Sequence, residues 1–308
     1  MIDQKNIEML FDCFDESATL LYKTYKTSYI DGLVITCENI MANSIEDKYS
    51  DIKSELQVLL DKVTSIEFDK EEIRKAFQYA CLRGFKHANI SNQMITPETM
   101  GIFINYLISK LYTRKELIVL DPLVGTGNLI TTIANNSDKK VSLIGIDSDE
   151  IMNKLSSALF DMLGYGDGIY CQDTLTYFGP QSDCIVADFS GIEETDAYRI
   201  IGHHGDNIQE GGFLIGIFNS DIIMPESLIE HSRELSETWK LFGLIGLPDK
   251  IAKNQNKSIV IFQRNGELVI IPHKFLLVGL PDFNEKDEMM KVIDQLNDWF
   301  KNTEFYKL

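Results

Sequence analysis

Apolar residues in the first part of the chain recur every three or four positions. Ile52, Leu56, Leu59 and Val63 are one example, and this spacing is typical of amphipathic helices. Residues 1–92 contain no proline and only two glycines, which favours uninterrupted helices. We therefore predict a helical N-terminal domain of about four helices over residues 1–92.

One of these helices is expected to begin at Asp69, which can cap it, with Glu71 and Glu72 in the first turn. Arg74 and Lys75 continue this charged run. Because charged side chains are mostly exposed in folded proteins, we expect the run to form a solvated face of the helix.

The pattern changes after residue 92. Short runs of β-branched and apolar residues now alternate with helical stretches, and most of these runs are apolar throughout. Strands covered by helices on both faces have this composition. The alternation predicts an α/β domain over residues 93–308 with a Rossmann-like, doubly wound, mostly parallel sheet. The later strands lack long helical spacers, so we expect an antiparallel far edge. The predicted strands lie within residues 117–122, 141–147, 183–189, 211–218, 241–248, 258–264 and 274–280.

The charge balance bears on the partners of the protein. The 308 residues include 47 acidic and 29 basic side chains, a net charge of -18. Affinity for nucleic acid comes largely from basic side chains that neutralise phosphates. We therefore expect weak binding to nucleic acid unless a partner protein assists. A protein or small-molecule partner fits this charge better. We expect a homodimer, or a protein partner bound through the helical domain.

Neither a membrane nor a secreted location is indicated. No apolar run reaches the roughly 18 residues that cross a bilayer, and the N-terminus lacks the pattern of a signal peptide. The five cysteines are scattered and form no CxxC pair, as in proteins of a reducing compartment. We expect a cytoplasmic protein without a metal site, and we interpret His203-His204 as a loop pair.

The segment from Asp121 to Gly127, Asp-Pro-Leu-Val-Gly-Thr-Gly, follows a predicted strand and opens a predicted helix. Glycines allow a sharp turn and a close approach of a ligand, and a helix N-terminus favours an anion. A phosphate-binding loop would need lysine at Asn128, and a dinucleotide fingerprint would need glycine at Ile130. S-adenosylmethionine (SAM) needs neither, because its only anion is a carboxylate. A purely structural turn remains the alternative.

Acidic residues follow the next two predicted strands. Asp147 lies 22 residues after Gly125, where a carboxylate can accept hydrogen bonds from both ribose hydroxyls. The alternative is that Asp147, next to Ser148, is a helix-capping or solvated aspartate. Asp173 and Thr174 follow a short strand, where a side-chain acceptor can meet the adenine amino group.

Thr96 and Pro97 are a strong helix start, with threonine as the N-cap and proline at the first helical position. With this segment included, the chain resembles the N6-adenine DNA methyltransferases. It is most similar to the modification subunits of type I restriction systems, and to a branch of small uncharacterised bacterial proteins. Those proteins carry a helical N-terminal domain, a Thr-Pro helix start, a DPxxGTG turn and acids after the second and third strands.

The resemblance implies a class I SAM-dependent methyltransferase with a seven-stranded sheet and SAM as cofactor. It implies transfer of a methyl group to a nitrogen, either adenine N6 in nucleic acid or a protein nitrogen, with Asp188 orienting the acceptor. The residues implied to bind the cofactor are Thr96, Asp121, Pro122, Gly125, Thr126, Gly127, Asn128, Asp147, Ser148, Asp173 and Thr174.

The chain departs from the family after the fourth strand. There the family has Asn, Asp or Ser, then two prolines and an aromatic residue that stacks on the flipped base. This chain has Asp188-Phe189-Ser190-Gly191, which predicts a less constrained loop, and Tyr198 is the nearest ring downstream. After the last strand we expect one packing helix over residues 284–302 and no target-recognition domain. The alternative function is a catalytically inactive protein that acts through cofactor or protein binding.

Overall fold

The computed structural model describes residues 2–92, 95–219, 235–248, 256–267, 269–270, 272 and 274–303. By its internal contacts the chain divides into two compact units. The first unit comprises Met1–Glu98, Val124–Asn135 and Gly145–Cys171. The second comprises Thr99–Leu123, Asn136–Ile144 and Gln172–Leu308. The predicted domain boundary falls between residues 92 and 93. Residues 93 and 94 lie outside the described residues, so the position of the boundary stays a prediction.

The N-terminal region is helical, as predicted. It consists of α1 (Gln4–Tyr25), α2 (Tyr29–Ala42), the 3-10 helix η1 (Asp47–Ile52), α3 (Lys53–Thr64) and α4 (Lys70–Ala88). Side-chain caps mark the starts of α1, α2 and α4. Asp69 accepts a hydrogen bond from the backbone of Glu71, and Glu72 reaches back to the backbone of Asp69, so α4 begins with a complete capping box.

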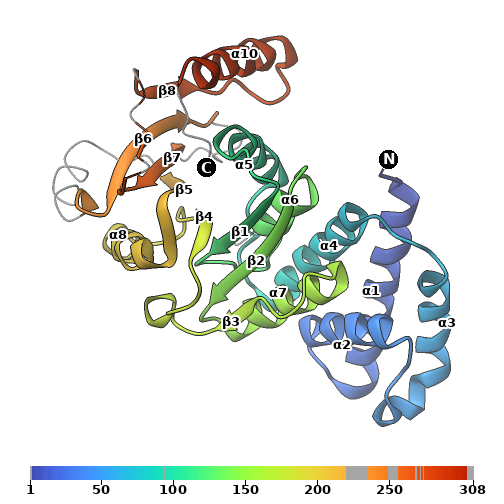
Figure 1. Ribbon diagram of the computed structural model, residues 1–308. Helices are drawn as coiled ribbons and strands as arrows, with labels where there is room; N and C mark the ends of the chain where they lie inside the picture. Colours follow the sequence, from blue (N-terminus) through green and yellow to red (C-terminus); the bar gives the residue numbers. More distant parts are fainter. Residues whose placement is uncertain are drawn as a thin grey trace. The chain divides into compact units, whose positions relative to one another are not determined.

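The larger hydrophobic core of the first unit joins its N-terminal helices to α7 (Glu150–Leu163). Phe14 of α1, Leu33 of α2 and Phe77 of α4 are buried in it with Leu155 and Leu159. The last two belong to α7, one of the helices of the α/β region. Helix α4 also contacts α6 (Asn128–Asn135), the helix that follows the glycine turn (Figure 1). The N-terminal helices therefore share their core with the part of the chain that carries this turn.

The strands form one sheet in the order β3-β2-β1-β4-β5-β7-β6-β8. Strand β4 is parallel to β1 and to β5, whereas β7 is antiparallel to both β5 and β6. The predicted mostly parallel sheet is confirmed. The far edge itself is not antiparallel as expected, because β7 lies between β5 and β6 and the edge pair β6–β8 is parallel. The sheet has eight strands, one more than the resemblance implies. Each of the seven predicted runs contributes a strand, and the short strand before Asp173 is the eighth. The strands are β1 (Glu116–Asp121), β2 (Lys140–Asp147), β3 (Ile169–Cys171), β4 (Ser182–Asp188), β5 (Ile208–Asn219), β6 (Trp239–Gly246), β7 (Lys257–Arg264) and β8 (Leu276–Gly279).

A buried polar centre joins three strands of the second unit. The hydroxyl of Tyr112 donates to the carbonyl of Asp183 over 2.6 Å and accepts from the backbone of Phe213 over 2.9 Å. The Asp183 carboxylate accepts from the backbone of Ile118 (2.7 Å) and from Arg114 (2.6 Å). Side chains thus link the first half of β1, the start of β4 and the middle of β5, in addition to the backbone ladder.

The remaining helices of the second unit are shorter or peripheral. They are α5 (Glu98–Leu111), the 3-10 helices η3 (Thr174–Thr176) and η4 (His204–Asn207), α8 (Glu194–His203) and α10 (Lys286–Asn302). Helix α10 packs as expected, with Trp299 edge-on to Phe242 at 5.6 Å between ring centroids. Within the described ranges, no helix is long and apolar enough to cross a membrane.

Candidate functional site

The glycine turn between β1 and α6 adopts backbone angles that favour glycine. Gly125 has φ +52° and Gly127 has φ +79°, in the left-handed region that other residues rarely occupy. The turn is closed by a hydrogen bond from the N–H of Gly127 to the carbonyl of Val124, over 2.8 Å. A side chain at either glycine would therefore strain the turn.

Asp147, at the end of β2, is tied to this turn by its side chain. Its Oδ2 accepts a hydrogen bond from the N–H of Gly125 over 2.9 Å, and its Oδ1 accepts one from the N–H of Asp149 over 2.8 Å. Burial raises the pKa of Asp147, and these N–H donors oppose the rise. The cap of α7 is Asp149, which accepts from the backbone of Ile151 and Met152. Asp147 therefore does not cap α7, which was one alternative for this residue.

Gly145 lets the end of β2 pass close to the turn. A Cβ atom at this position would lie 2.6 Å from Cγ2 of Val124, which is closer than such atoms approach. The N–H of Val124 also donates to the carbonyl of Ile146 over 2.9 Å. The turn and the end of β2 that carries Asp147 are thus packed closely and hydrogen-bonded to each other within the first unit.

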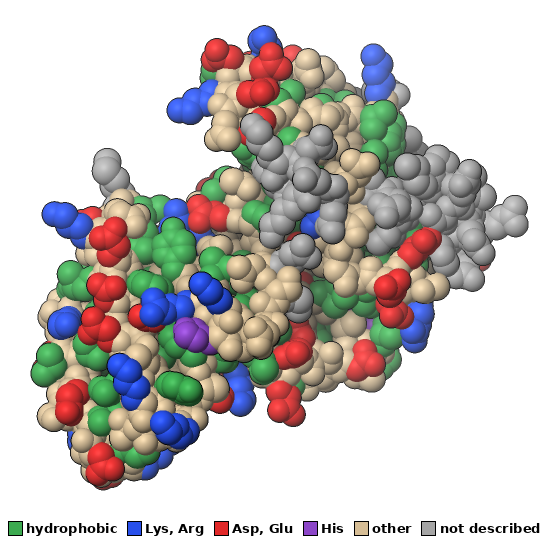
Figure 2. Space-filling view, turned by 180° about the vertical axis from the view of Figure 1, so that it is seen from behind, with side chains coloured by type: hydrophobic (Ala, Val, Ile, Leu, Met, Phe, Trp, Pro, Cys, Tyr) green, Lys and Arg blue, Asp and Glu red, His purple; other side chains and the backbone are tan. Residues whose placement is uncertain are grey.

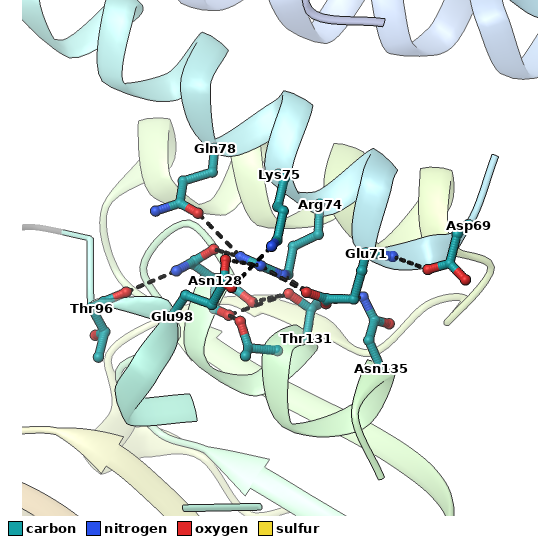
Figure 3. A network of polar contacts seen from close by, with 12 residues as sticks. Asp69, Glu71, Arg74, Lys75, Gln78, Thr96, Glu98, Asn128, Thr131 and Asn135 are labelled. Carbon is teal, nitrogen blue, oxygen red and sulfur yellow. Dashed lines mark hydrogen bonds and ion pairs between the residues drawn. The ribbon is translucent and has the colours of Figure 1, made fainter. Parts of the chain in front are cut away.

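Thr96 and Asn128, predicted separately as cofactor residues, are brought together. The side-chain amide of Asn128 donates to the carbonyl of Thr96 over 2.8 Å, and its Oδ1 accepts from Nη1 of Arg74 over 2.7 Å. These contacts are drawn in Figure 3. Because Asn128 is only 4% exposed, its side chain makes its hydrogen bonds inside the protein.

The expectation of a solvated face holds for Asp69 and Lys70 but is wrong for the charged residues that follow them. Glu71, Glu72 and Arg74 are all buried. Glu71 and Arg74 are buried because this side of α4 faces α6, where Asn128 and Asn135 supply polar partners. Glu72 instead accepts from Asp3 and Asn6 at the start of α1. Charge alone predicts exposure, and only the packing of the two helices reveals the opposite.

In the second unit, Asp121 ends β1 and is 1% exposed, with its Oδ1 accepting from the N–H of Leu123 over 3.0 Å. Pro122 beside it is buried. Asp121 and Asp188 end the parallel neighbours β1 and β4, so the predicted acids lie at the same edge of this part of the sheet.

Asp173 and Thr174 differ in their surroundings. Asp173 is exposed and caps η3 by accepting from the N–H of Leu175 over 2.9 Å. Thr174 is buried, and its hydroxyl bonds with Nε2 of His204 over 2.8 Å. Burial, aided by the neighbouring His203, lowers the pKa of His204 to about 4, so this imidazole is neutral at pH 7. In the described part of the chain, no three His, Cys, Asp or Glu side chains gather as a metal site.

The loop after β4 is held by side chains in place of the two prolines. The Asp188 carboxylate accepts from the N–H of Ser190 (3.1 Å) and from its hydroxyl (2.5 Å). Lys257 donates to that hydroxyl over 2.9 Å, and Asn219 donates to the Ser190 carbonyl over 2.9 Å. The expectation of a less constrained loop therefore overlooks four hydrogen bonds, two of which come from residues distant in sequence.

The aromatic residues near this loop point into the protein. Phe189 is 0% exposed and stacks on Phe218, with ring centroids 4.7 Å apart and planes 12° apart. Tyr198, the nearest ring downstream, is buried in α8. Gly191 carries no side chain. None of these positions presents a ring to a ligand.

Two sequence comparisons locate the chain among known proteins. Residues 8–85 match the family model of the YtxK N-terminal helical domain. Over 332 aligned residues the chain is 29% identical to the uncharacterised protein YtxK of Bacillus subtilis strain 168, covering 97% of this chain and 99% of that protein. The helical region and the sheet region therefore occur together in this relative.

Solved structures show the same fold. A putative class I SAM-dependent methyltransferase from Listeria monocytogenes matches with a TM-score of 0.85 at 24% identity, covering 97% of this chain and all of that one. This chain has the class I methyltransferase fold. A type I restriction-modification methyltransferase subunit from Streptococcus thermophilus matches with a TM-score of 0.57 at 11% identity, over 94% of this chain and 77% of that one. A modification subunit of a putative type I restriction enzyme from Vibrio vulnificus matches with a TM-score of 0.54 at 15% identity, over 79% and 61%.

The predicted site residues divide between the two units. Thr96, Gly125, Thr126, Gly127, Asn128, Asp147 and Ser148 belong to the first unit. Asp121, Pro122, Asp173, Thr174 and Asp188 belong to the second.

Proposed function

We propose that this protein binds SAM, with the methionine carboxylate at the turn of residues 125–127 and the ribose hydroxyls at Asp147. The observation that carries the proposal is the hydrogen bond from Gly125 to Asp147. It holds the carboxylate of the second strand against a turn whose two glycines have positive φ. The class I methyltransferase fold of the solved relatives supports the same ligand.

The donor set fits SAM better than a phosphorylated cofactor. Asn128 stands where a phosphate-binding loop has lysine, and its side chain is taken up by Thr96 and Arg74. SAM has no phosphate, and its carboxylate can be bound by backbone N–H groups and a helix N-terminus alone. We assign Asp121 to the amino or sulfonium end of SAM, and Asp173 with Thr174 to the adenine.

SAM supplies an electrophilic methyl group, and the protein's part is to position the acceptor. We propose a nitrogen acceptor in nucleic acid or protein, oriented by Asp188. The hydrogen bonds from Ser190 fix this carboxylate, and Lys257 brings a positive charge to the same loop. Transfer would then need little acid–base chemistry from the chain.

A second candidate is a protein that binds SAM without methyl transfer and acts through protein contacts. The observation in its favour is the buried stack of Phe189 on Phe218, which leaves the loop without a ring for a flipped base. On the face drawn in Figure 2, Lys and Arg side chains are interspersed with Asp and Glu. Partners bound through the helical domain of residues 1–92, or a homodimer, belong to this proposal.

Titration of SAM into the wild-type protein and Asp147→Ala tests the binding. Transfer of labelled methyl groups from SAM to mixed cellular acceptors separates the two candidates, because only the enzyme incorporates label. A cytosolic location is part of the proposal, and the five free cysteines support it.

A further inference from the structure

Arg74 lies in the interior of the first unit with every donor of its guanidinium used. It is 0% exposed, and it carries the five N–H donors of any arginine. Two of these donate to the carboxylate of Glu71, each over 2.8 Å. The others donate to Gln78 (3.1 Å), Asn128 (2.7 Å) and Glu98 (2.7 Å). The orientation of the guanidinium is therefore determined completely by its acceptors.

These acceptors lie on three different elements (Figure 3). Glu71 and Gln78 belong to α4 itself, Glu98 begins α5 just after Thr96 and Pro97, and Asn128 begins α6 immediately after Gly127. The guanidinium of Arg74 thus connects the N-terminal helices to the helix start at Glu98 and to the end of the glycine turn.

The ion pair of Arg74 and Glu71 holds α6 at both ends. Arg74 binds Asn128, the first residue of this eight-residue helix, over 2.7 Å. Oε1 of Glu71 accepts from the side chain of Asn135, its last residue, over 2.8 Å. So short a helix is marginal in isolation. Its placement, and with it the placement of the turn before it, therefore depends on α4.

The ion pairs around Arg74 indicate that it orients neighbouring groups, rather than that it raises the overall stability of the protein. Lys75 also pairs with Glu98, over 3.1 Å. Burial opposes ionisation of Glu98, but Arg74 and Lys75 outweigh it and lower the pKa of this carboxyl. Buried ion pairs often stabilise a protein no more than apolar residues would. A guanidinium that uses all its donors, two of them on one carboxylate, instead fixes the orientation of the side chains bonded to it.

We propose that Arg74 is a positioning residue for the glycine turn. By fixing Asn128, and through it the carbonyl of Thr96, it sets the start of α6 and makes the N-terminal helices part of the support of the site. The expected effect on SAM affinity rests on the proposed function, whereas the expected effect on the conformation of the turn does not.

Two variants and one control test the inference. Arg74→Lys keeps a positive charge beside Glu71 and Glu98 but lacks the planar fork. Asn128→Ala removes the link to the turn and leaves the pairs of Arg74 on α4 intact. Arg83→Lys is the control, because Arg83 is on the same helix, is half-exposed and pairs with Asp15 over 2.7 Å.

The first measurement is hydrogen exchange of the amides of residues 125–135 in the protein without ligand. Both variants should speed this exchange about tenfold, the effect of one lost charge-assisted hydrogen bond. The amides of α1 and α2 should stay at wild-type rates, which shows that the fold is intact. The second measurement is SAM affinity, which should weaken about tenfold in both variants. Arg83→Lys should match the wild type in both.

The double variant should weaken SAM no more than the stronger single variant, because both act through the same hydrogen bond. Wild-type exchange at residues 125–135 in both single variants would overturn the inference. So would faster exchange with unchanged SAM affinity. If the wild-type protein binds no SAM, the proposed function fails, and the exchange rates alone decide whether Arg74 positions the turn.

Discussion

The N–H of Gly125 donates a hydrogen bond to Oδ2 of Asp147, over 2.9 Å and across 22 residues of sequence. This contact joins the loop after the first strand to the end of the second strand. It makes the conformation of the turn depend on a carboxylate, and the position of that carboxylate depend on the turn. The two features that the sequence marks as a cofactor site are therefore one structural piece.

The positive φ of Gly127 leads to the first prediction. Gly127→Ala should cost about 1–2 kcal/mol of stability, because an L-residue is strained in the left-handed region, and it should also weaken SAM binding. Chemical denaturation and calorimetry measure the two effects.

Gly164 provides the matched control. It has φ +69° with no atom within 4 Å of an added Cβ, so Gly164→Ala should cost a similar amount of stability and leave SAM binding unchanged. Equal losses of affinity in both variants would mean that the turn at 127 has no special part in binding.

Tyr112→Phe should lower the free energy of unfolding by about 1–3 kcal/mol. The variant leaves the carbonyl of Asp183 and the N–H of Phe213 buried without the hydroxyl that both use. Urea denaturation should show a lower midpoint with an unchanged slope. Tyr22→Phe is the control, since Tyr22 is largely exposed, and a loss as large in that variant would contradict the explanation.

Much of the architecture follows from local sequence, and the departures from it have physical reasons. The turn at Gly125 and Gly127 and the acid at Asp147 were predicted because strand ends, glycines and spacing are local features. The burial of Arg74 was missed because it arises from the packing of α4 against α6, 54 residues away along the chain. The bond from Lys257 to Ser190 spans 67 residues, and no local pattern indicates it.

His204 should make the stability pH-dependent in a defined window. Burial lowers its pKa from 6.5 to about 4, so the unfolded chain takes up a proton below pH 6.5 while the folded protein does so only near pH 4. The free energy of unfolding should therefore fall as pH drops from 6.5 to 4, by about 3 kcal/mol from this residue. Above pH 6.5 the residue should have no effect.

Denaturation of the wild type and His204→Gln across this range isolates the contribution. The variant can keep a hydrogen bond to Thr174 but cannot titrate, so its stability should depend less on pH by about that amount. Parallel pH curves for the two proteins would show that folding does not shift the pKa of His204.

The chain alone should not methylate adenine in duplex DNA. Flipping a base costs a few kcal/mol, which an aromatic side chain normally offsets in part, and Phe189 is buried on Phe218. The net charge of -18 also opposes binding to a polyanion. The assay is incorporation of labelled methyl groups into genomic DNA that lacks adenine methylation. Robust incorporation that disappears in Asp188→Ala would mean that Asp-Phe-Ser-Gly is a working acceptor loop.

The central claim is that SAM binds where the turn meets Asp147, and calorimetric titration of the purified protein tests it most directly. Wild-type protein should bind SAM with one site per chain, and Asp147→Ala should bind at least about tenfold more weakly, since it loses the carboxylate that we propose accepts hydrogen bonds from the ribose. Asp167→Ala, which removes an exposed carboxylate of the same unit, should bind like the wild type. Absence of binding to the wild type at millimolar SAM, or equal affinities of the wild type and Asp147→Ala, would contradict the account.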